Sequence, residues 1–185
     1  MPLADRVIKE VLDGGAILPF SPVYVQPSTY DIHLGGRFGS YLEQYDGQRI
    51  IYPAMELNED AEKVWVDVEE GGFYILAPGQ FTLACSLEYF HVPPNMQWTL
   101  AGKSSRGRMG IFIHVTAGLL DPGFEGVLVL ELYNASPIPR RLRPGQSIGQ
   151  INFDYLTGGA AERPYGSPLL GSHYQGQQTT TGARW

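Results

Sequence analysis

Residues 81–89, with the sequence FTLACSLEY, place a large apolar side chain or a cysteine at every second position. A period of two is typical of a β-strand whose two faces meet different surroundings. On both sides of this segment, further strand-like runs occur at 73–76, 97–101, 111–116, 127–133 and 147–153. Pro-Gly and Pro-Pro pairs separate several of these runs and favour tight turns. The pattern predicts a mainly β fold, a distorted antiparallel β-barrel or jelly-roll sandwich.

The two ends of the chain depart from this pattern. Residues 7, 8, 11 and 12 are apolar with helical spacing, which predicts one short N-terminal helix, capped by Asp5 and ended by Gly14 and Gly15. Residues 157–185 are rich in Gly, Ser, Gln and Thr and predict a flexible C-terminal tail that orders on binding. We therefore expect a single β domain over 1–156, with the acidic segment 41–72 as an excursion from its sheet.

The composition excludes several classes of protein. The chain has 185 residues and a formal net charge of −6, which argues against general nucleic-acid binding. No apolar run approaches the roughly 18 residues that a membrane span needs, and the first residues lack the apolar core of a signal peptide. Cys85 is the single cysteine, so no thiolate zinc cluster is expected. We predict a soluble cytoplasmic protein that binds neither nucleic acid nor membrane.

The charge is unevenly distributed along the chain. Residues 1–100 carry a net charge of −9, whereas residues 101–185 carry +3. An anionic ligand is therefore expected to bind the second half. Arginine suits forked recognition of phosphate, but Arg140, Arg141 and Arg143 are interpreted as residues that solvate a turn.

Glu131 is the first candidate for chemistry. Strand parity places it on one face with Val127, Val129 and Tyr133, while three leucines occupy the other face. A carboxyl group in such apolar surroundings is desolvated, and desolvation raises a carboxyl pKa toward the range useful for general acid–base catalysis. The alternative is a structural acid paired with an arginine.

The segment 102–110, GKSSRGRMG, is the second candidate. It combines adjacent hydroxyls, three cations and three glycines, which together can surround a phosphate group. Its spacing is not that of a P-loop, and a basic turn with serine caps is the alternative interpretation. Asp121, which precedes a Pro-Gly turn ten residues before Glu131, is the third candidate and could hold a sugar hydroxyl.

Together these segments resemble the dCTP deaminase family of the trimeric dUTPase superfamily. The resemblance runs nearly from end to end and rests on motifs in family order: 26–35 (QPSTYDIHLG), 102–110 (GKSSRGRMG), 117–124 (AGLLDPGF), 148–150 (IGQ), and the tail segments 163–166 (RPYG) and 174–177 (YQGQ). It implies a dUTPase-like β domain that forms a homotrimer with its sites at subunit interfaces.

The resemblance also implies an activity, zinc-independent deamination of dCTP to dUTP and ammonia, which would supply dUTP and dUMP for thymidylate synthesis. Glu131 would accept a proton from the water that attacks C4 of cytosine, and Ser104 and Arg108 would position the water and the carboxylate. Asp121 and Ala117 would contact the nucleoside, and the backbone at Val129 and Leu130 would contact the edge of the base.

The family pattern assigns the triphosphate to a third group of residues. Mg²⁺ would be bound by the triphosphate itself rather than by protein ligands, and dTTP is a candidate feedback ligand. His173 stands where family members commonly carry a lysine, and a neutral imidazole binds phosphate less well than an ammonium group. The implied triphosphate contacts are Lys103, Ser104, Ser105, Arg108, Gln150, Tyr165, His173 and Gln177.

Two alternatives remain open. The first is a bifunctional enzyme that converts dCTP to dUMP and pyrophosphate: residues 117–118 and the tail resemble bifunctional relatives, whereas residues 114–116 resemble deaminase-only ones. The second is a non-catalytic trimeric regulator that binds a nucleotide and does not need Glu131.

Several further positions receive structural interpretations. His33 is expected at the surface, His91 in a turn, and His114 in a buried, hydrogen-bonded position near the site. Arg106 and Tyr30 depart from the family pattern; Arg106 stands where an apolar residue is usual, and Tyr30 is bulky for its place.

Overall fold

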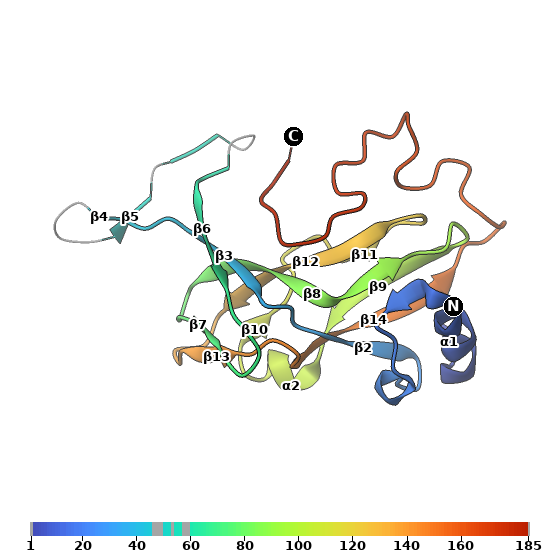
Figure 1. Cartoon of the computed structure of the whole chain (residues 1–185), viewed down its shortest axis with the longest axis horizontal. Helices are drawn as coiled ribbons and strands as arrows, with labels where there is room; N and C mark the ends of the chain where they lie inside the picture. The colour runs from blue at the N-terminus through green and yellow to red at the C-terminus, as the bar shows by residue number, and fades with distance from the viewer. Residues whose placement is uncertain (1, 46–49, 53, 57–59, 185) are drawn as a thin grey trace.

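The computed structural model describes residues 2–45, 50–52, 54–56 and 60–184. Helix α1 (Asp5–Val11) and the π-helical turn η1 (Leu12–Ala16) open the chain, and strands dominate the rest (Figure 1). The remaining elements are β1 (Ile17–Leu18), η2 (Pro22–Tyr24), β2 (Thr29–His33), β3 (Arg37–Tyr41), β4 (Gln44–Tyr45), β5 (Ile50–Ile51), β6 (Lys63–Asp67), β7 (Tyr74–Leu76), β8 (Phe81–His91), β9 (Met96–Gly102), α2 (Ser104–Gly107), β10 (Ile111–Phe112), β11 (Leu119–Leu120), β12 (Glu125–Asn134), β13 (Arg140–Leu142) and β14 (Ser147–Tyr155).

Two antiparallel sheets form the body of the fold. One has the strand order β10-β12-β8-β3-β6, with β1 paired to β8, and the other has the order β11-β9-β14-β2. The core lies between them, where Trp98 of β9 packs edge-on against Phe90 of β8 and Phe153 of β14. The predicted mainly β, antiparallel fold with one short N-terminal helix is confirmed. No helix in the described ranges is long and apolar enough to cross a membrane.

The apolar alternation in β8 marks the outer face of its sheet rather than the core. The core face carries Thr82, Ala84, Ser86, Glu88 and Phe90, each at most 2% exposed. On the other face, which holds the conspicuous apolar stripe, Leu87 is 50% exposed. Opposed residues on neighbouring strands share a face, and Leu83 lies opposite Glu131 of β12. The stripe in the sequence therefore continues to the candidate catalytic carboxylate.

A buried hydrogen-bonded pair of side chains joins β2 to β8 on the core side. Nδ1 of His33 lies 2.6 Å from Oε1 of Glu88, and the backbone N–H of His33 donates to both carboxylate oxygens. The ring of Tyr24 covers His33 at 4.1 Å between centroids. The expectation that His33 lies at the surface is wrong, because a strand position flanked by apolar residues can be buried when a partner supplies its polar contacts.

The burial of Glu88 predicts how the free energy of unfolding depends on pH. Burial raises the pKa of Glu88 above its ordinary value, and the contacts with His33 oppose this only in part. A raised carboxyl pKa in the folded state contributes stability below the unfolded pKa, and that contribution is lost as pH rises through the folded pKa. We expect the free energy of unfolding of the wild type to fall, relative to that of Glu88→Gln, between about pH 4.5 and neutrality. Urea unfolding of both proteins over this range measures the difference, and parallel curves would contradict it.

Some element boundaries differ from those predicted. Ala4, not Asp5, is the N-cap of α1, while Asp5 accepts a hydrogen bond from the N–H of Arg6. The run 111–116 is a strand only over β10, because the chain then folds back beside Glu131. The segment 41–72 is not wholly an excursion, since β6 pairs with β3 in the main sheet. His91 ends β8 rather than lying in a turn.

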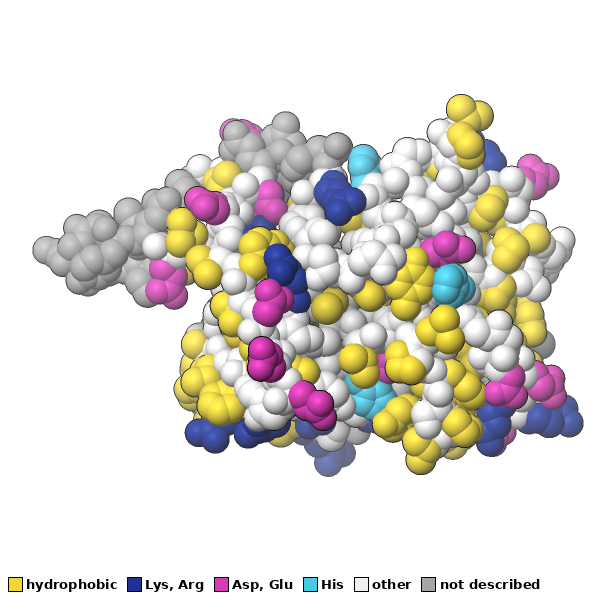
Figure 2. Space-filling model, in the orientation of Figure 1, with side chains coloured by type: hydrophobic (Ala, Val, Ile, Leu, Met, Phe, Trp, Pro, Cys, Tyr) yellow, Lys and Arg dark blue, Asp and Glu magenta, His cyan; other side chains and the backbone are white. Residues whose placement is uncertain are grey.

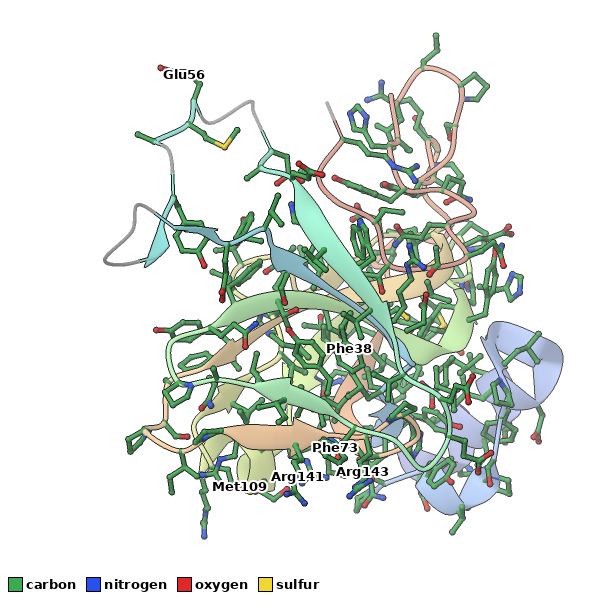
Figure 3. The ribbon with its side chains drawn as sticks, turned by 60° about the vertical axis from the view of Figure 1, so that its left-hand side comes forward. Phe38, Glu56, Phe73, Met109, Arg141 and Arg143 are labelled. Atoms are coloured by element: carbon green, nitrogen blue, oxygen red, sulfur yellow. The ribbon has the colours of Figure 1, made fainter. Side chains whose placement is uncertain are left out.

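The arginines of β13 have a structural role that their sequence did not reveal. β13 pairs with β7, and the guanidinium groups of Arg141 and Arg143 lie 4.7 and 5.2 Å from the ring centroid of Phe73 (Figure 3). Arg143 also donates to the carbonyls of Gly71 and Gly72. Arg141 and Arg143 therefore support the two-stranded sheet of β7 and β13 through cation–π contacts, so the interpretation that they only solvate a turn is wrong.

Candidate active site

A cleft of about 400 Å³ lies between the outer face of β8 and β12 and the C-terminal tail. The tail crosses the upper edge of the molecule above β12 in Figure 1. Strands supply one wall, the 117–124 hairpin supplies one end, and the segment around β6 supplies the other. The polar and aromatic residues that line it are Tyr41, Asp60, Lys63, Phe81, Asp121, Phe124, Glu131, Tyr165, Tyr174, Gln177 and Thr181.

Glu131 faces this cleft from β12. Its Oε2 accepts hydrogen bonds from the backbone N–H of Val115 at 2.6 Å and of Thr116 at 3.4 Å. Its own N–H donates to the carbonyl of Ile113, so the 113–116 segment is fixed beside the carboxylate. No arginine among the described residues pairs with Glu131. The side chain is half-buried, so the strongly apolar surroundings expected from strand parity are not supplied by this chain alone.

The predicted nucleoside contacts divide into two groups. Asp121, Ala117 and Val129 line the cleft with Glu131. The side chain of Leu130 is fully buried in the core, because its strand position has the opposite parity. A register shift between Val127 and Val129 bends β12 at this point, next to the cleft.

The tail is attached to β12 by a short parallel pairing at Gln177. The N–H of Val127 donates to the carbonyl of Gln177 at 3.0 Å, and Nε2 of Gln177 donates to the carbonyl of Val127 at 2.8 Å. Gly126 has φ +144°, and a Cβ there would lie 3.1 Å from Gln177, so this approach requires glycine. Gln177 thus fixes the tail to β12 in this conformation through both its backbone and its side chain.

Two other predicted tail residues have different surroundings. Tyr165 packs edge-on against Phe124 at 5.7 Å, and its hydroxyl accepts the N–H of Tyr174. His173 is exposed, and its carbonyl accepts a hydrogen bond from Arg184. The structure therefore brings Tyr165 to the cleft, whereas His173 lies outside it. The flexibility of residues 157–185 stays a prediction.

The residues of the predicted phosphate cradle lie around α2. Lys103 forms an ion pair with Asp31, and Nε2 of Gln150 donates to the carbonyl of Gly102. Ser104, Ser105 and Arg108 are exposed, with no hydrogen bond from their side chains to another described residue. The guanidinium of Arg106 donates to the carbonyl of Ser147 at 2.7 and 3.0 Å. Arg106 therefore anchors the cradle to β14, which explains a cation at this position.

The cradle and the cleft lie at opposite edges of the molecule. Figure 1 shows α2 at the lower edge and the tail along the upper edge. Lys and Arg side chains gather along that lower edge, over β13 and α2, in Figure 2. A second depression of about 370 Å³ beside the cradle is lined by Lys103 and His114. Nδ1 of His114 is buried and has no hydrogen-bond partner within the described part of the chain, so the expected hydrogen bond is not formed at this atom.

Tyr41, Asp60 and Lys63 are among the cleft residues that the sequence interpretation missed. All three come from the acidic segment that was expected to leave the sheet. Tyr41 of β3 lies opposite Lys63 of β6, and its ring stacks on that of Phe81. Tyr41 and Lys63 therefore lie on the same face of the sheet as Phe81. Only the pairing of β6 with β3 could have revealed this, and no local pattern predicts that pairing.

Metal-ligating side chains do not gather in this site. Within the described ranges, no group of three or more His, Cys, Asp or Glu side chains could hold a metal ion. Cys85 is buried as a free thiol. The fold and the site together define an antiparallel β domain with a carboxylate in a tail-covered cleft and a basic cradle at the opposite edge.

Comparison with known proteins identifies the family. The profile of the dCTP deaminase-like family matches residues 3–156, and the chain belongs to this family. It is 40% identical over 183 residues to a protein of Corynebacterium efficiens named "dCTP deaminase, dUMP-forming", covering 98% of this chain and 92% of that one. It is 41% identical over 186 residues to a Bifidobacterium longum protein of the same name, covering 100% and 94%.

A solved structure shares the fold. The 2'-deoxycytidine 5'-triphosphate deaminase of Agrobacterium tumefaciens superposes with a TM-score of 0.62 at 22% sequence identity. The match covers 83% of this chain and 48% of that one, so this chain spans about half of the solved protein. The family membership and the shared fold confirm the resemblance seen in the sequence.

Proposed function

We propose that this protein deaminates dCTP and hydrolyses the product to dUMP and pyrophosphate. The observation that carries the proposal is the placement of Glu131 and Asp121 in one cleft, with the Glu131 carboxylate held by backbone N–H groups and paired with no arginine among the described residues. Relatives of nearly full-length coverage named "dCTP deaminase, dUMP-forming" support it.

Glu131 acts as the proton carrier of the deamination. Oε1 makes no hydrogen bond with another described residue, so it can accept a proton from a water that adds to C4 of cytosine. The proton then passes to N3, and a second proton, taken from the new C4 hydroxyl, passes to the amino group. The C4–N bond then breaks, a carbonyl forms at C4 and ammonia leaves. Hydrogen bonds from Val115 and Thr116 to Oε2 fix the carboxylate while the proton moves.

In the second half of the proposed reaction, dUTP is hydrolysed, so that dUMP is the final product. Water adds to the α-phosphorus of dUTP, the bond to the bridging oxygen of the β-phosphate breaks, and pyrophosphate leaves. The name of the relatives, dUMP-forming, supports the bifunctional alternative over release of dUTP. Mg²⁺ would be held by the triphosphate oxygens and would neutralise part of their charge.

The site is completed by a second copy of the chain in this proposal. Because α2 lies at the edge of the fold opposite the tail, the cradle of one copy would meet the cleft of its neighbour. Phe112, Val115 and Leu119 are more than half exposed near these elements and offer an apolar surface for association. A homotrimer closes such a head-to-tail contact into a ring. Binding of dTTP as a feedback ligand and a cytoplasmic location stay predictions.

One assay tests the proposed function. The protein is incubated with dCTP and Mg²⁺, and dUTP, dUMP, ammonia and pyrophosphate are resolved over time. We expect ammonia, pyrophosphate and dUMP in equal amounts. Accumulation of dUTP without pyrophosphate would support a deaminase-only enzyme. Tight nucleotide binding without any product would instead support the non-catalytic regulator, whose cradle needs no catalytic Glu131.

A further inference from the structure

The wall of the cleft contains a charged pair that the proposed mechanism does not use. Lys63 is paired with Asp60 and lies 4.8 Å from the ring centroid of Tyr41. The Lys63 side chain is only 5% exposed. A lysine is rarely buried to this extent unless its charge is matched, so the pair forms a fixed polar unit in the cleft wall.

The last residues of the tail pack directly on this pair. The N–H of Ala183 donates to Oδ2 of Asp60 at 3.1 Å. A Cβ at Gly182 would lie 2.6 Å from the same oxygen, so the backbone approaches Asp60 as closely as glycine permits. Two residues before Gly182, the buried hydroxyl of Thr180 donates a hydrogen bond to the carbonyl of Arg37.

These contacts give the tail a second attachment. Gln177 fixes it to β12, and Asp60 fixes residues 182–183 to the segment before β6. Thr181 lies between the two attachments and lines the cleft, and its buried hydroxyl has no hydrogen-bond partner among the residues that the structure describes. A buried hydroxyl without a partner is costly unless a ligand satisfies it.

We infer that Asp60 and Lys63 are positioning residues that clamp the tail across the cleft and present the Thr181 hydroxyl to the bound nucleotide. This inference rests on the proposed function for its kinetic consequences. A clamped tail keeps the deaminated intermediate in the cleft until its triphosphate is hydrolysed. Loss of the clamp releases dUTP between the two steps.

The principal test is Asp60→Ala, with Asp67→Ala as the matched control. Asp67 is an aspartate at the other end of β6, paired with Arg37, and its side chain is 70% exposed. Loss of a charge-assisted hydrogen bond should raise KM for dCTP about tenfold. It should also lower kcat and increase the ratio of dUTP to dUMP released, whereas Asp67→Ala should leave all three unchanged.

Hydrogen exchange gives a readout that does not depend on activity. In Asp60→Ala, the amides of 180–184 should exchange faster while those of 174–177 keep the wild-type rate. Unchanged exchange at 180–184 would overturn the clamp even if the protein deaminates dCTP. Faster exchange in a protein that forms no product would retain the clamp and reject the proposed function.

A double-mutant cycle separates the clamp from a general loss of stability. Gly182→Ala alone should weaken dCTP binding, because its Cβ meets Oδ2 of Asp60. In the Asp60→Ala background that oxygen is absent, so Gly182→Ala should have little further effect. Additive effects would contradict direct contact. Thr181→Val should raise KM without changing exchange at 180–184, and an unchanged KM would remove Thr181 from the nucleotide contacts.

Discussion

Replacing Glu131 with Gln should lower kcat for dCTP deamination by about a hundredfold or more, while dCTP still binds. The amide oxygen of Gln can accept the N–H groups of Val115 and Thr116, so the position of the side chain is kept. The amide cannot take up the proton of the attacking water, which removes the proton relay. Single-turnover formation of ammonia and equilibrium binding of dCTP measure the two effects separately.

Glu125→Gln is the matched control for this experiment. Glu125 lies on the same strand but is exposed, with His91 3.7 Å from its carboxylate, and it does not line the cleft. We expect wild-type kcat from it. A Glu131→Gln protein that keeps more than about a tenth of the wild-type kcat would show that the carboxylate is not the general base.

Mixing two inactive variants should restore activity if cradle and cleft come from different copies. Arg108→Ala removes a cation from the cradle, and Glu131→Gln removes the proton carrier from the cleft. In a ring assembled at random from equal amounts, about a quarter of the sites combine an intact cradle with an intact cleft. After joint unfolding and refolding, we therefore expect about a quarter of the wild-type kcat per site, against almost none for either variant alone.

The controls for this experiment concern assembly. Wild type taken through the same refolding gives the reference activity, and the two variants mixed without unfolding should stay inactive while subunits do not exchange. Sedimentation should show a trimer in each sample. Recovery of no activity from mixed trimers would mean that both parts of the site belong to one chain.

The sequence was sufficient for the short helix, the family and strands such as β8 and β12, whereas β3, β6 and β13 were not predicted. Alternation in 81–89 and in 127–133 predicts strands because side chains on successive residues of an extended chain point to opposite faces. The motifs around Glu131 and Asp121 identify the family because they recur in order. The structure places both residues in one cleft, and their roles stay predictions.

Tertiary structure decided which face of each strand is buried. The apolar stripe of β8 points toward the cleft, and the polar set with Glu88 points into the core. Alternation reveals two faces but does not say which one another sheet will cover. For the same reason His33 was expected at the surface, although Glu88, 55 positions away, makes its burial favourable.

The sequence by itself determined a mainly β domain of the dCTP deaminase-like family with its candidate carboxylates, because these follow from local periodicity and ordered motifs. Only the tertiary structure decided that the cradle lies opposite the cleft and that Asp60 meets Gly182. The physical reason is that both facts depend on contacts between distant segments. Asp60 and Gly182 meet through the pairing of β6 with β3 and the path of the tail, and a local pattern encodes neither.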